Sequence, residues 1–126
     1  MNLNQVTILS LDLDKAVIFY KTLGLNLIVD ALPYYARFLC PDDNATFSIH
    51  KVEQLSQNSE TSIYFECENL DDKVSNLISQ GIIFDELPND KPWLWREVRL
   101  KDLYGNQLIL YFAGENRINP PWKIKT

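Results

Sequence analysis

Side chains able to bind a polar or flat ligand gather in a short segment that runs from Trp93 to Arg99. Arginine makes paired hydrogen bonds to carboxylate or phosphate. Glu97 and Arg99 stand at alternate positions, so one strand face would present both to a polar ligand. Trp93 and Trp95 could form an aromatic wall for a flat or apolar ligand. The structural alternatives are an exposed ion pair and an aromatic cover over a dimer interface, and the sequence leaves them open.

Glu66 is the candidate for proton transfer. A phenylalanine and a cysteine flank it. Because dry surroundings raise the pKa of a carboxyl group, Glu66 could act as a catalytic base.

His50, the single histidine of the chain, could approach Ser48 or Ser62. No acid is fixed by spacing to orient that histidine, so the pattern lacks a complete nucleophilic site.

A motif that occurs twice would position these residues. The segment Asp12–Leu25 (DLDKAVIFYKTLGL) aligns without a gap with Asn69–Ile82 (NLDDKVSNLISQGI). Each copy has a capping residue, apolar positions at helical spacing, and a glycine that favours the end of a helix. A strand-like run precedes each copy, at Val6–Leu11 and at Ile63–Cys67. The repeat predicts two copies of one strand-helix-strand module in a single chain.

Alternation of apolar and polar residues, with turn residues between the runs, predicts eight strands. They are Asn4–Leu11, Leu25–Val29, Tyr34–Cys40, Ala45–Val52, Ser62–Cys67, Ile82–Glu86, Trp93–Lys101 and Gln107–Phe112. We expect a single domain over residues 1–126. Its parts would be a first module at 1–55, a linker at 56–61, a second module at 62–112 and a C-terminal arm at 113–126.

One face of the predicted strands is uniformly apolar and is expected to pack against the helices. The opposite face carries Gln5, Thr7, Thr46, Ser48, His50, Ser62, Tyr64, Glu66, Gln107 and Tyr111. If Asp102 and Asn106 face each other across a turn, Glu97 and Arg99 join this face together with Ile109 and Tyr111. A flat sheet would expose these side chains to solvent, whereas a curled sheet would gather them in a cavity. Alternation alone leaves that choice open.

Composition excludes several classes of protein. The chain has 126 residues, 46% of them hydrophobic, and a net charge of −5. Dispersed acidic residues argue against a nucleic-acid partner, and no apolar run is long enough to span a membrane. The N-terminus lacks the basic start and cleavage site of a signal peptide. With Cys40 and Cys67 interpreted as reduced core residues, we expect a cytoplasmic protein.

Two segments resemble signatures of the vicinal-oxygen-chelate superfamily, which includes glyoxalase I, extradiol dioxygenases, fosfomycin-resistance enzymes and bleomycin-resistance proteins. They are D-L-x-K-A-x-x-F-Y-x-x-L-G (Asp12–Gly24) and W-R-E-V-R-L-K-D-L-Y-G-N-Q-L (Trp95–Leu108), the latter with Leu103 and Tyr104 in place of the usual proline and aspartate. The resemblance implies an α+β fold of two paired βαβββ modules, whose curled mixed sheets surround a ligand cavity. It also implies a homodimer, with the modules paired within one chain or between two.

The resemblance further implies where metal ligands would lie in metal-dependent relatives. Those places fall on Gln5 and His50, which can coordinate a metal, and on Ser62 and Ile109, which replace the usual histidine and glutamate. A catalytic divalent metal needs at least three strong protein ligands. The two remaining ligands would therefore need a carboxylate from elsewhere in the cavity, and Glu66 and Glu97 are the candidates.

We therefore expect a metal-free protein without a cofactor that binds and sequesters a small molecule. The predicted ligand-binding residues are Gln5, Ser48, His50, Tyr64, Trp93, Trp95, Glu97, Arg99 and Tyr111. The alternative is a lyase, isomerase or dioxygenase in which a divalent metal polarises the vicinal oxygens of its substrate. A cavity that only binds a protein partner is a third possibility. The absence of metal ligands at Ser62 and Ile109 favours the metal-free binding protein. The presence of residues that can coordinate a metal at Gln5 and His50 favours the metal-dependent enzyme.

Overall fold

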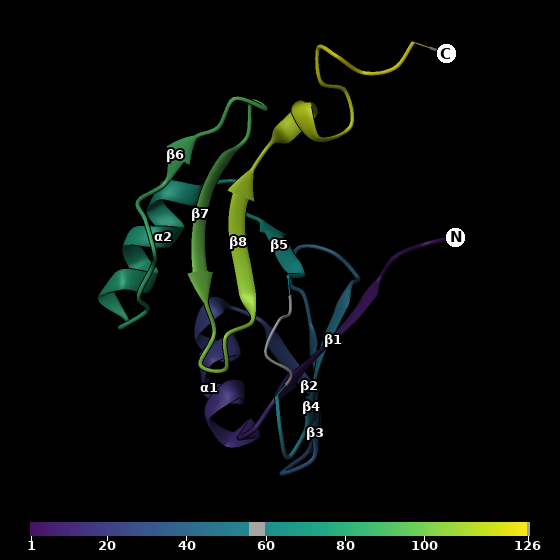
Figure 1. The fold of residues 1–126 in the computed structure, drawn as a ribbon, viewed down its shortest axis with the longest axis vertical. Helices are drawn as coiled ribbons and strands as arrows, with labels where there is room; N and C mark the ends of the chain where they lie inside the picture. The colour runs from purple at the N-terminus through teal and green to yellow at the C-terminus, as the bar shows by residue number, and fades with distance from the viewer. Residues whose placement is uncertain (56–59, 126) are drawn as a thin grey trace. The chain divides into compact units, whose positions relative to one another are not determined.

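The computed structural model describes residues 1–55 and 60–125, so the predicted linker at 56–61 lies mostly outside the described residues. The chain divides into two compact units by its internal contacts. Unit 1 comprises Met1–Glu60 and Asp102–Asn106, and unit 2 comprises Thr61–Lys101 and Gln107–Thr126. Within the described residues, each unit contains one α-helix and one four-stranded mixed sheet (Figure 1). The predicted α+β fold of two βαβββ modules is therefore confirmed, and neither sheet closes on itself in the described part of the chain.

Unit 1 follows the predicted order of elements. They are β1 (Gln5–Ser10), α1 (Leu13–Leu23), β2 (Asn26–Ala31), β3 (Tyr35–Leu39) and β4 (Thr46–Lys51). The sheet order is β1-β4-β3-β2, with β1 parallel to β4 and the other pairs antiparallel. Asp12 begins the helix as predicted, because its side chain accepts the Lys15 N–H at 3.3 Å. Gly24 ends it with φ of 108°, a left-handed conformation that glycine adopts without steric cost.

The core of unit 1 lies between α1 and the apolar face of its sheet. Tyr20 of α1 is fully buried and its ring lies 4.7 Å from that of Phe47 and 6.1 Å from that of Phe38. The Tyr20 hydroxyl, which would be costly to bury alone, donates to Asp102 Oδ2 at 2.7 Å. Burial raises the pKa of Tyr20, and the neighbouring Asp102 carboxylate adds to the rise.

The turn Asp102–Asn106 therefore belongs to unit 1, although the strands on either side of it belong to unit 2. Asp102 also accepts the backbone N–H groups of Tyr104 and Asn106, at 2.9 and 3.0 Å. Asn106 Nδ2 donates to the Leu9 carbonyl at 3.0 Å. Gly105 has the predicted positive φ, 83°. The aspartate, glycine and asparagine of this turn are thus explained by hydrogen bonding and backbone conformation.

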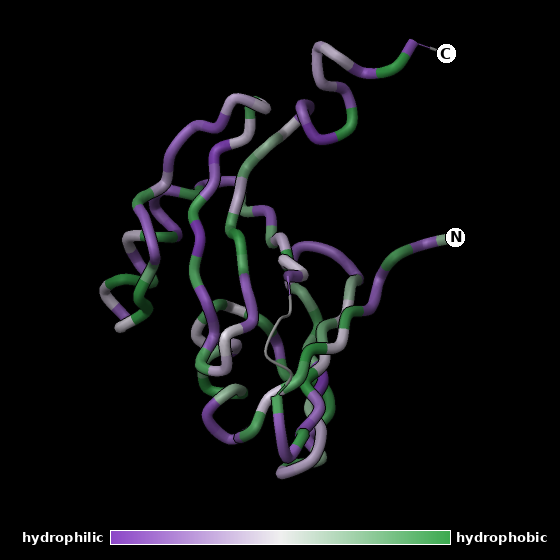
Figure 2. Tube along the Cα trace, in the orientation of Figure 1, coloured by the Kyte–Doolittle hydropathy of each residue, from purple (hydrophilic) through white to green (hydrophobic). Residues whose placement is uncertain are grey.

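Unit 2 repeats the module. It contains β5 (Ser62–Glu66), α2 (Leu70–Ser79), β6 (Asn89–Asp90), β7 (Arg96–Lys101), β8 (Gln107–Phe112) and the 3₁₀ helix η1 (Gly114–Arg117). The sheet order, β5-β8-β7-β6, matches that of unit 1. Hydrophilic and hydrophobic residues alternate along much of β7 (Figure 2). That alternation separates a helix-facing side, where Val98 and Leu100 are buried, from a polar side.

Three predictions of local structure are wrong. The sixth strand is the short β6, and Ile82–Glu86 is irregular. Asp85 N–H donates to the Arg99 carbonyl at 2.9 Å, but Pro88 has no N–H to extend a ladder. β7 begins at Arg96, after a turn in which Leu94 N–H donates to the Lys91 carbonyl. Asn69 makes no side-chain capping hydrogen bond to α2.

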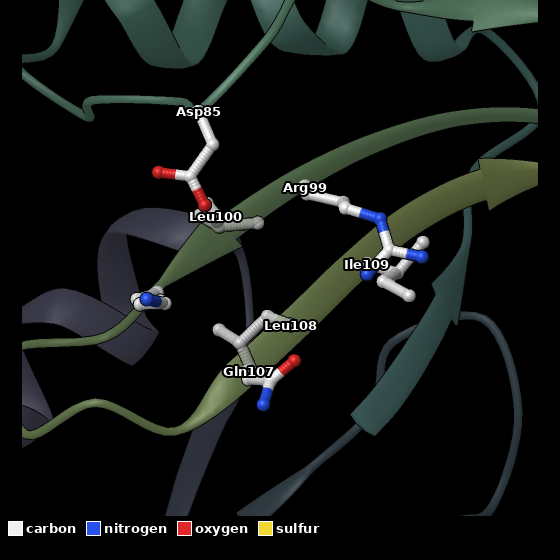
Figure 3. A pocket seen from close by; sticks show the side chains of 7 residues that line it. Asp85, Arg99, Leu100, Gln107, Leu108 and Ile109 are labelled. Atoms are coloured by element: carbon white, nitrogen blue, oxygen red, sulfur yellow. The ribbon is translucent and has the colours of Figure 1, made fainter. Parts of the chain in front are cut away.

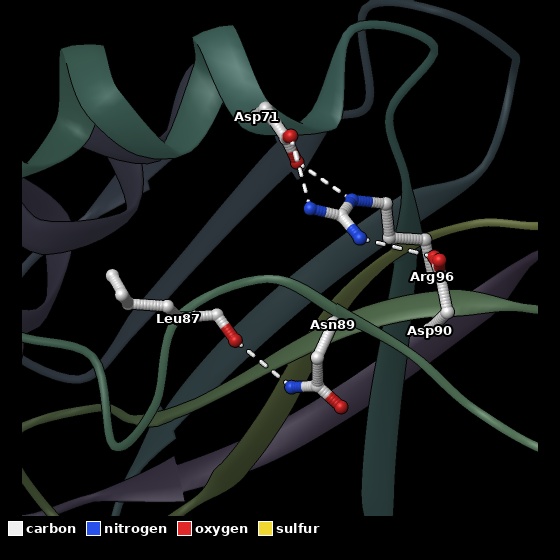
Figure 4. Close-up of polar contacts among 5 residues, drawn as sticks. All are labelled: Asp71, Leu87, Asn89, Asp90 and Arg96. Carbon is white, nitrogen blue, oxygen red and sulfur yellow. Dashed lines mark hydrogen bonds and ion pairs between the residues drawn. The ribbon is translucent and has the colours of Figure 1, made fainter.

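Arg96 joins α2 to the edge of the unit 2 sheet (Figure 4). Its guanidinium donates to both carboxylate oxygens of Asp71, at 2.9 and 3.0 Å, and to Asp90 at 3.0 Å. In the same view the Asn89 amide donates to the Leu87 carbonyl at 2.8 Å. The hydrogen bond from Arg96 lowers the pKa of Asp71.

No helix in the described ranges is both long and apolar enough to cross a membrane.

Candidate functional site

The polar face of the unit 2 sheet carries most of the predicted ligand-binding residues. In the observed register Glu97 lies opposite Tyr111 and Arg99 lies opposite Ile109. Asp102 N–H bonds to the Asn106 carbonyl across the turn, which fixes this register as predicted. β5 adds Tyr64 beside Ile109 on the same face. The structure thus brings four of the predicted residues, from three strands, into one surface.

Tyr64, Trp95 and Tyr111 form an aromatic cluster on this face. The Trp95 ring stacks on that of Tyr111 with centroids 4.8 Å apart, and the Tyr64 ring meets both edge-on at 5.9 and 5.5 Å. Tyr111 is buried and Trp95 half-buried, whereas Tyr64 is 45% exposed. Trp95 Nε1 donates to the Asn116 carbonyl at 3.2 Å, which fixes its orientation. The cluster therefore offers a ligand an ordered aromatic surface with one open side.

Glu97 is fully buried at the centre of the face, between Tyr111 on β8 and Asn89 on β6. Its Oε2 accepts the indole N–H of Trp93 at 2.6 Å. Its Oε1 is buried and has no hydrogen-bond partner in the described structure. The described residues show no ion pair between Glu97 and Arg99. The exposed ion pair considered from the sequence is thus replaced by a buried carboxylate with a tryptophan donor.

Trp93 lies at the tip of the hairpin that connects β6 to β7. Lys91 N–H donates to the Trp95 carbonyl at 2.8 Å, and Leu94 has a left-handed φ of 68° that non-glycine residues rarely adopt. The Trp93 side chain is 42% exposed although its indole N–H reaches Glu97. In the sequence, the short spacing between Trp93 and Glu97 is the feature that could have indicated this contact, because a tight turn can bring the two side chains together.

Glu66, the predicted base, makes a different set of contacts. Its Oε2 accepts the N–H groups of Ala113 and Gly114, at 2.9 and 3.1 Å, where η1 begins. Its Oε1 lies 3.7 Å from Arg117 Nε. Burial raises the pKa of the adjacent Tyr111 phenol, and the Glu66 carboxylate contributes to that rise. The contacts of Glu66 are those of a carboxylate that anchors η1, and its role as a base stays a prediction.

A basic edge lies at the other end of this face, beside the turn that joins β7 to β8. Arg99 and Lys101 are exposed there, and Lys101 is opposite Gln107. With Asp85 they line an open hollow of about 160 Å³. Figure 3 shows the Arg99 guanidinium beside Ile109, and the Asp85 carboxylate on another side of the hollow. The hollow is much smaller than the pockets that enclose drug-sized ligands, so it could bind only part of a ligand.

The polar face of unit 1 contains a connected hydrogen-bond network. Gln5 Nε2 donates to Ser48 Oγ at 2.9 Å, and its Oε1 accepts from Thr46 Oγ1. Ser48 Oγ lies 2.8 Å from the Tyr35 hydroxyl, which accepts from Arg37 Nε at 2.9 Å. The hydrogen bond with Ser48 is the main cause that lowers the pKa of Tyr35. Sequence reasoning missed the roles of Tyr35 and Arg37, which alternation along their strand could have revealed.

The structure does not bring the two predicted metal ligands of unit 1 together. Gln5 pairs with Thr46, whereas His50 lies opposite Leu9 at the far end of the same parallel pair. A separation of four residues at about 3.3 Å each places them roughly 13 Å apart along the sheet. His50 is exposed, with Tyr35 as its other cross-strand neighbour.

The donor set of each unit does not fit a divalent metal. The described residues contain no group of three histidine, cysteine, aspartate or glutamate side chains that could hold one. In unit 2 the remaining family places are held by Ser62, a weak ligand, and by Ile109, which has no donor atom and is buried under the aromatic cluster. Catalytic metal sites use three strong protein ligands, and the described residues of neither unit supply such a set.

The two βαβββ modules and the signature turn, each described above, are the features that point to the class of the protein. The sequence matches the Glyoxalase/Bleomycin resistance protein/Dioxygenase superfamily over residues 2–110. The chain therefore belongs to this superfamily, as its resemblance predicted. A search of curated proteins found no match.

Solved structures of the superfamily share the fold at low sequence identity. A member from Sphaerobacter thermophilus is 21% identical with a TM-score of 0.73, covering 89% of this chain and 97% of its own. A bleomycin-binding protein solved with bleomycin is 18% identical with a TM-score of 0.73, covering 89% and 98%. A lactoylglutathione lyase from Agrobacterium tumefaciens is 15% identical with a TM-score of 0.73, covering 89% and 93%. A binding protein and an enzyme thus match equally well, so the likeness identifies the fold alone.

Proposed function

We propose that this protein is a metal-free binding protein that sequesters a small molecule with a flat ring. The observation that carries the proposal is the aromatic cluster of Tyr64, Trp95 and Tyr111, which is ordered by stacking and by the Trp95 hydrogen bond yet open at Tyr64. Rings held in this way lose little conformational freedom when a ligand stacks on them. Offset or edge-on contacts between rings add about 0.5–1.5 kcal/mol each.

The polar groups of each unit, taken by itself, support binding over chemistry. Glu66 anchors η1, and Glu97 accepts from Trp93. The polar side chains of unit 1 largely hydrogen-bond to one another, as Gln5, Ser48 and Tyr35 do. Such groups orient a ligand at low reorganisation cost. The bleomycin-binding neighbour provides a precedent in which this fold binds a small molecule.

We further propose that the protein is a cytoplasmic homodimer. Both cysteines, Cys40 and Cys67, are free thiols, which fits a reducing compartment. The C-terminal arm exposes Ile118, Trp122 and Ile124, and exposed apolar side chains of this kind are typical of association surfaces.

The binding proposal is tested by calorimetry with naphthylmethanol, a flat neutral probe, after chelator treatment of the protein. We expect saturable binding to the wild type that weakens roughly tenfold in Tyr64→Ala, because one ring contact and its buried area are lost. Tyr34→Ala is the matched control, since Tyr34 is exposed in unit 1 and outside the cluster. Equal loss in both variants, or binding only after a divalent metal is restored, would refute the proposal and favour the metal-dependent enzyme.

A further inference from the structure

Glu97 has an acceptor atom for which the described protein supplies no donor. The side chain is fully buried, Oε2 is bonded to Trp93, and Oε1 has no partner. A buried carboxylate oxygen without a donor is strongly disfavoured, because desolvation is not repaid by a hydrogen bond. A donor from outside the chain would remove that cost. The location of Oε1 within the proposed binding face makes a ligand the natural source of that donor.

The surroundings of Glu97 favour a cationic donor. Trp93 donates to it, Trp95 stands two positions before it on the same side of the chain, and Tyr111 lies directly opposite. The faces of aromatic rings attract cations within about 6 Å. A second carboxylate, Glu66, lies beyond Tyr111 in the same row of the sheet. Arg99, a cation on this side, is exposed and makes no ion pair with Glu97 among the described residues.

The one side chain seen to bind Glu97 in the described structure, Trp93, is itself partly exposed. This side chain is 42% exposed and extends from a hairpin tip rather than from a paired strand. The residue that follows it, Leu94, adopts the left-handed conformation. Because Trp93 lies outside β7, a rotation of its side chain would release Glu97 Oε2 without breaking the ladder between β7 and β8.

We propose that Glu97 recognises a protonated amine carried by an aromatic ligand, with the ammonium donating to Oε1 while the ring contacts Trp95 and Tyr64. This assignment rests on the proposed function and adds a ligand class to it. The aromatic cluster supplies affinity for the ring, and the buried carboxylate selects the cation. Charge-assisted hydrogen bonds of this type are about twice as strong as neutral ones, so the carboxylate would determine specificity.

Three naphthyl probes that differ only in their polar group test the assignment: naphthylmethylammonium, naphthylmethanol and naphthylacetate. By calorimetry on the wild type, we expect the ammonium to bind roughly tenfold more tightly than the alcohol, and the acetate to bind most weakly. Glu97→Gln should remove most of this preference, because it weakens binding of the ammonium far more than binding of the alcohol. Asp72→Asn is the control for net charge, because Asp72 is exposed on α2 and away from this face.

Trp93→Phe provides an independent test if Glu97→Gln does not fold. This variant keeps an aromatic ring but removes the indole donor, which leaves both oxygens of Glu97 in need of a partner. The ammonium probe should then bind several-fold more tightly than it binds the wild type. Unchanged or weaker binding would overturn the assignment.

The outcomes separate this assignment from the proposed function. Equal affinity for the ammonium and the alcohol would refute the role of Glu97 while the aromatic binding surface stands. Preference for the acetate would also refute it and would point to the basic edge at Arg99 and Lys101. Failure of all three probes to bind would refute both the assignment and the proposed function.

Discussion

Tyr20→Phe removes one hydroxyl from the core of unit 1 and tests the role of the signature turn. The Tyr20 hydroxyl donates to Asp102 Oδ2 at 2.7 Å, and the ring is fully buried. Phenylalanine keeps the ring contacts with Phe47 and Phe38, so no cavity larger than the lost oxygen forms. Hydrogen bonds to charged groups contribute about 1.5–3 kcal/mol. Asp102 would retain its bonds from Tyr104 and Asn106, so we expect a loss near 2 kcal/mol, within that range.

Urea unfolding at neutral pH measures this loss as a lower midpoint with an unchanged slope. Tyr34→Phe is the matched control, since Tyr34 is exposed and none of the hydrogen bonds of the described residues involves its hydroxyl. A loss in Tyr20→Phe no larger than in the control would refute the argument that the Tyr20–Asp102 bond stabilises the turn.

The same variant makes a second, pH-dependent test. The pKa of Tyr20 is raised in the folded protein, so its phenol stays protonated while the unfolded chain ionises near pH 10. Its contribution is therefore fully present below about pH 10 and decreases as the pH rises further. Tyr20→Phe should flatten the alkaline decrease in stability, and an identical alkaline profile in both proteins would contradict the assignment of that pKa.

The remaining predictions concern unit 2 and assembly. Arg96→Met should raise the pKa of Asp71 toward its ordinary value, because the hydrogen bond from Arg96 lowers it; carboxyl NMR titration measures this, and an unmoved Asp71 would contradict it. A carboxyl group whose pKa is lower in the folded protein than in the unfolded chain stabilises the fold at pH values above its unfolded pKa, and this contribution is lost as the pH falls. The wild type should therefore lose more stability on acidification than the variant. Leu77→Ala should cost about 2–5 kcal/mol in urea unfolding, because Leu77 of α2 is 1% exposed; a loss below 1 kcal/mol would mean that α2 is loosely packed. Sedimentation at micromolar concentration should show a dimer, and a monomer would refute the proposed assembly.

The modules could be predicted from the sequence because their determinants are local. Helical spacing and a following glycine define each helix, the Asp12 cap adds to α1, and Gly24 and Gly105 have the positive φ that their positions required. The turn from Asp102 to Asn106 set the register of β7 against β8, so Glu97 and Arg99 were placed on the correct face.

The environments of the site residues were not predictable, because they depend on contacts between distant segments. Glu97 and Arg99 look like a surface ion pair in the sequence, yet Glu97 is buried and accepts the indole N–H of Trp93 from the hairpin that connects β6 to β7. Glu66 accepts the N–H groups of Ala113 and Gly114 where η1 begins, and no pattern in the sequence of the C-terminal arm indicates this contact. The short β6 was not predictable, because the apolar run at Ile82–Glu86 favours a strand there, whereas Pro88 cannot donate to a ladder and pairing begins only at Asn89.

The most direct test of the central claim is to follow the three indole N–H resonances in ¹H–¹⁵N spectra of the chelator-treated protein during addition of naphthylmethanol. Trp93 and Trp95 border the proposed binding surface, whereas Trp122 lies in the C-terminal arm and serves as an internal control. Metal-free binding at the aromatic cluster predicts saturable shifts of Trp95 and Trp93 with Trp122 unmoved. Resonances that stay fixed until a divalent metal is added would contradict the account.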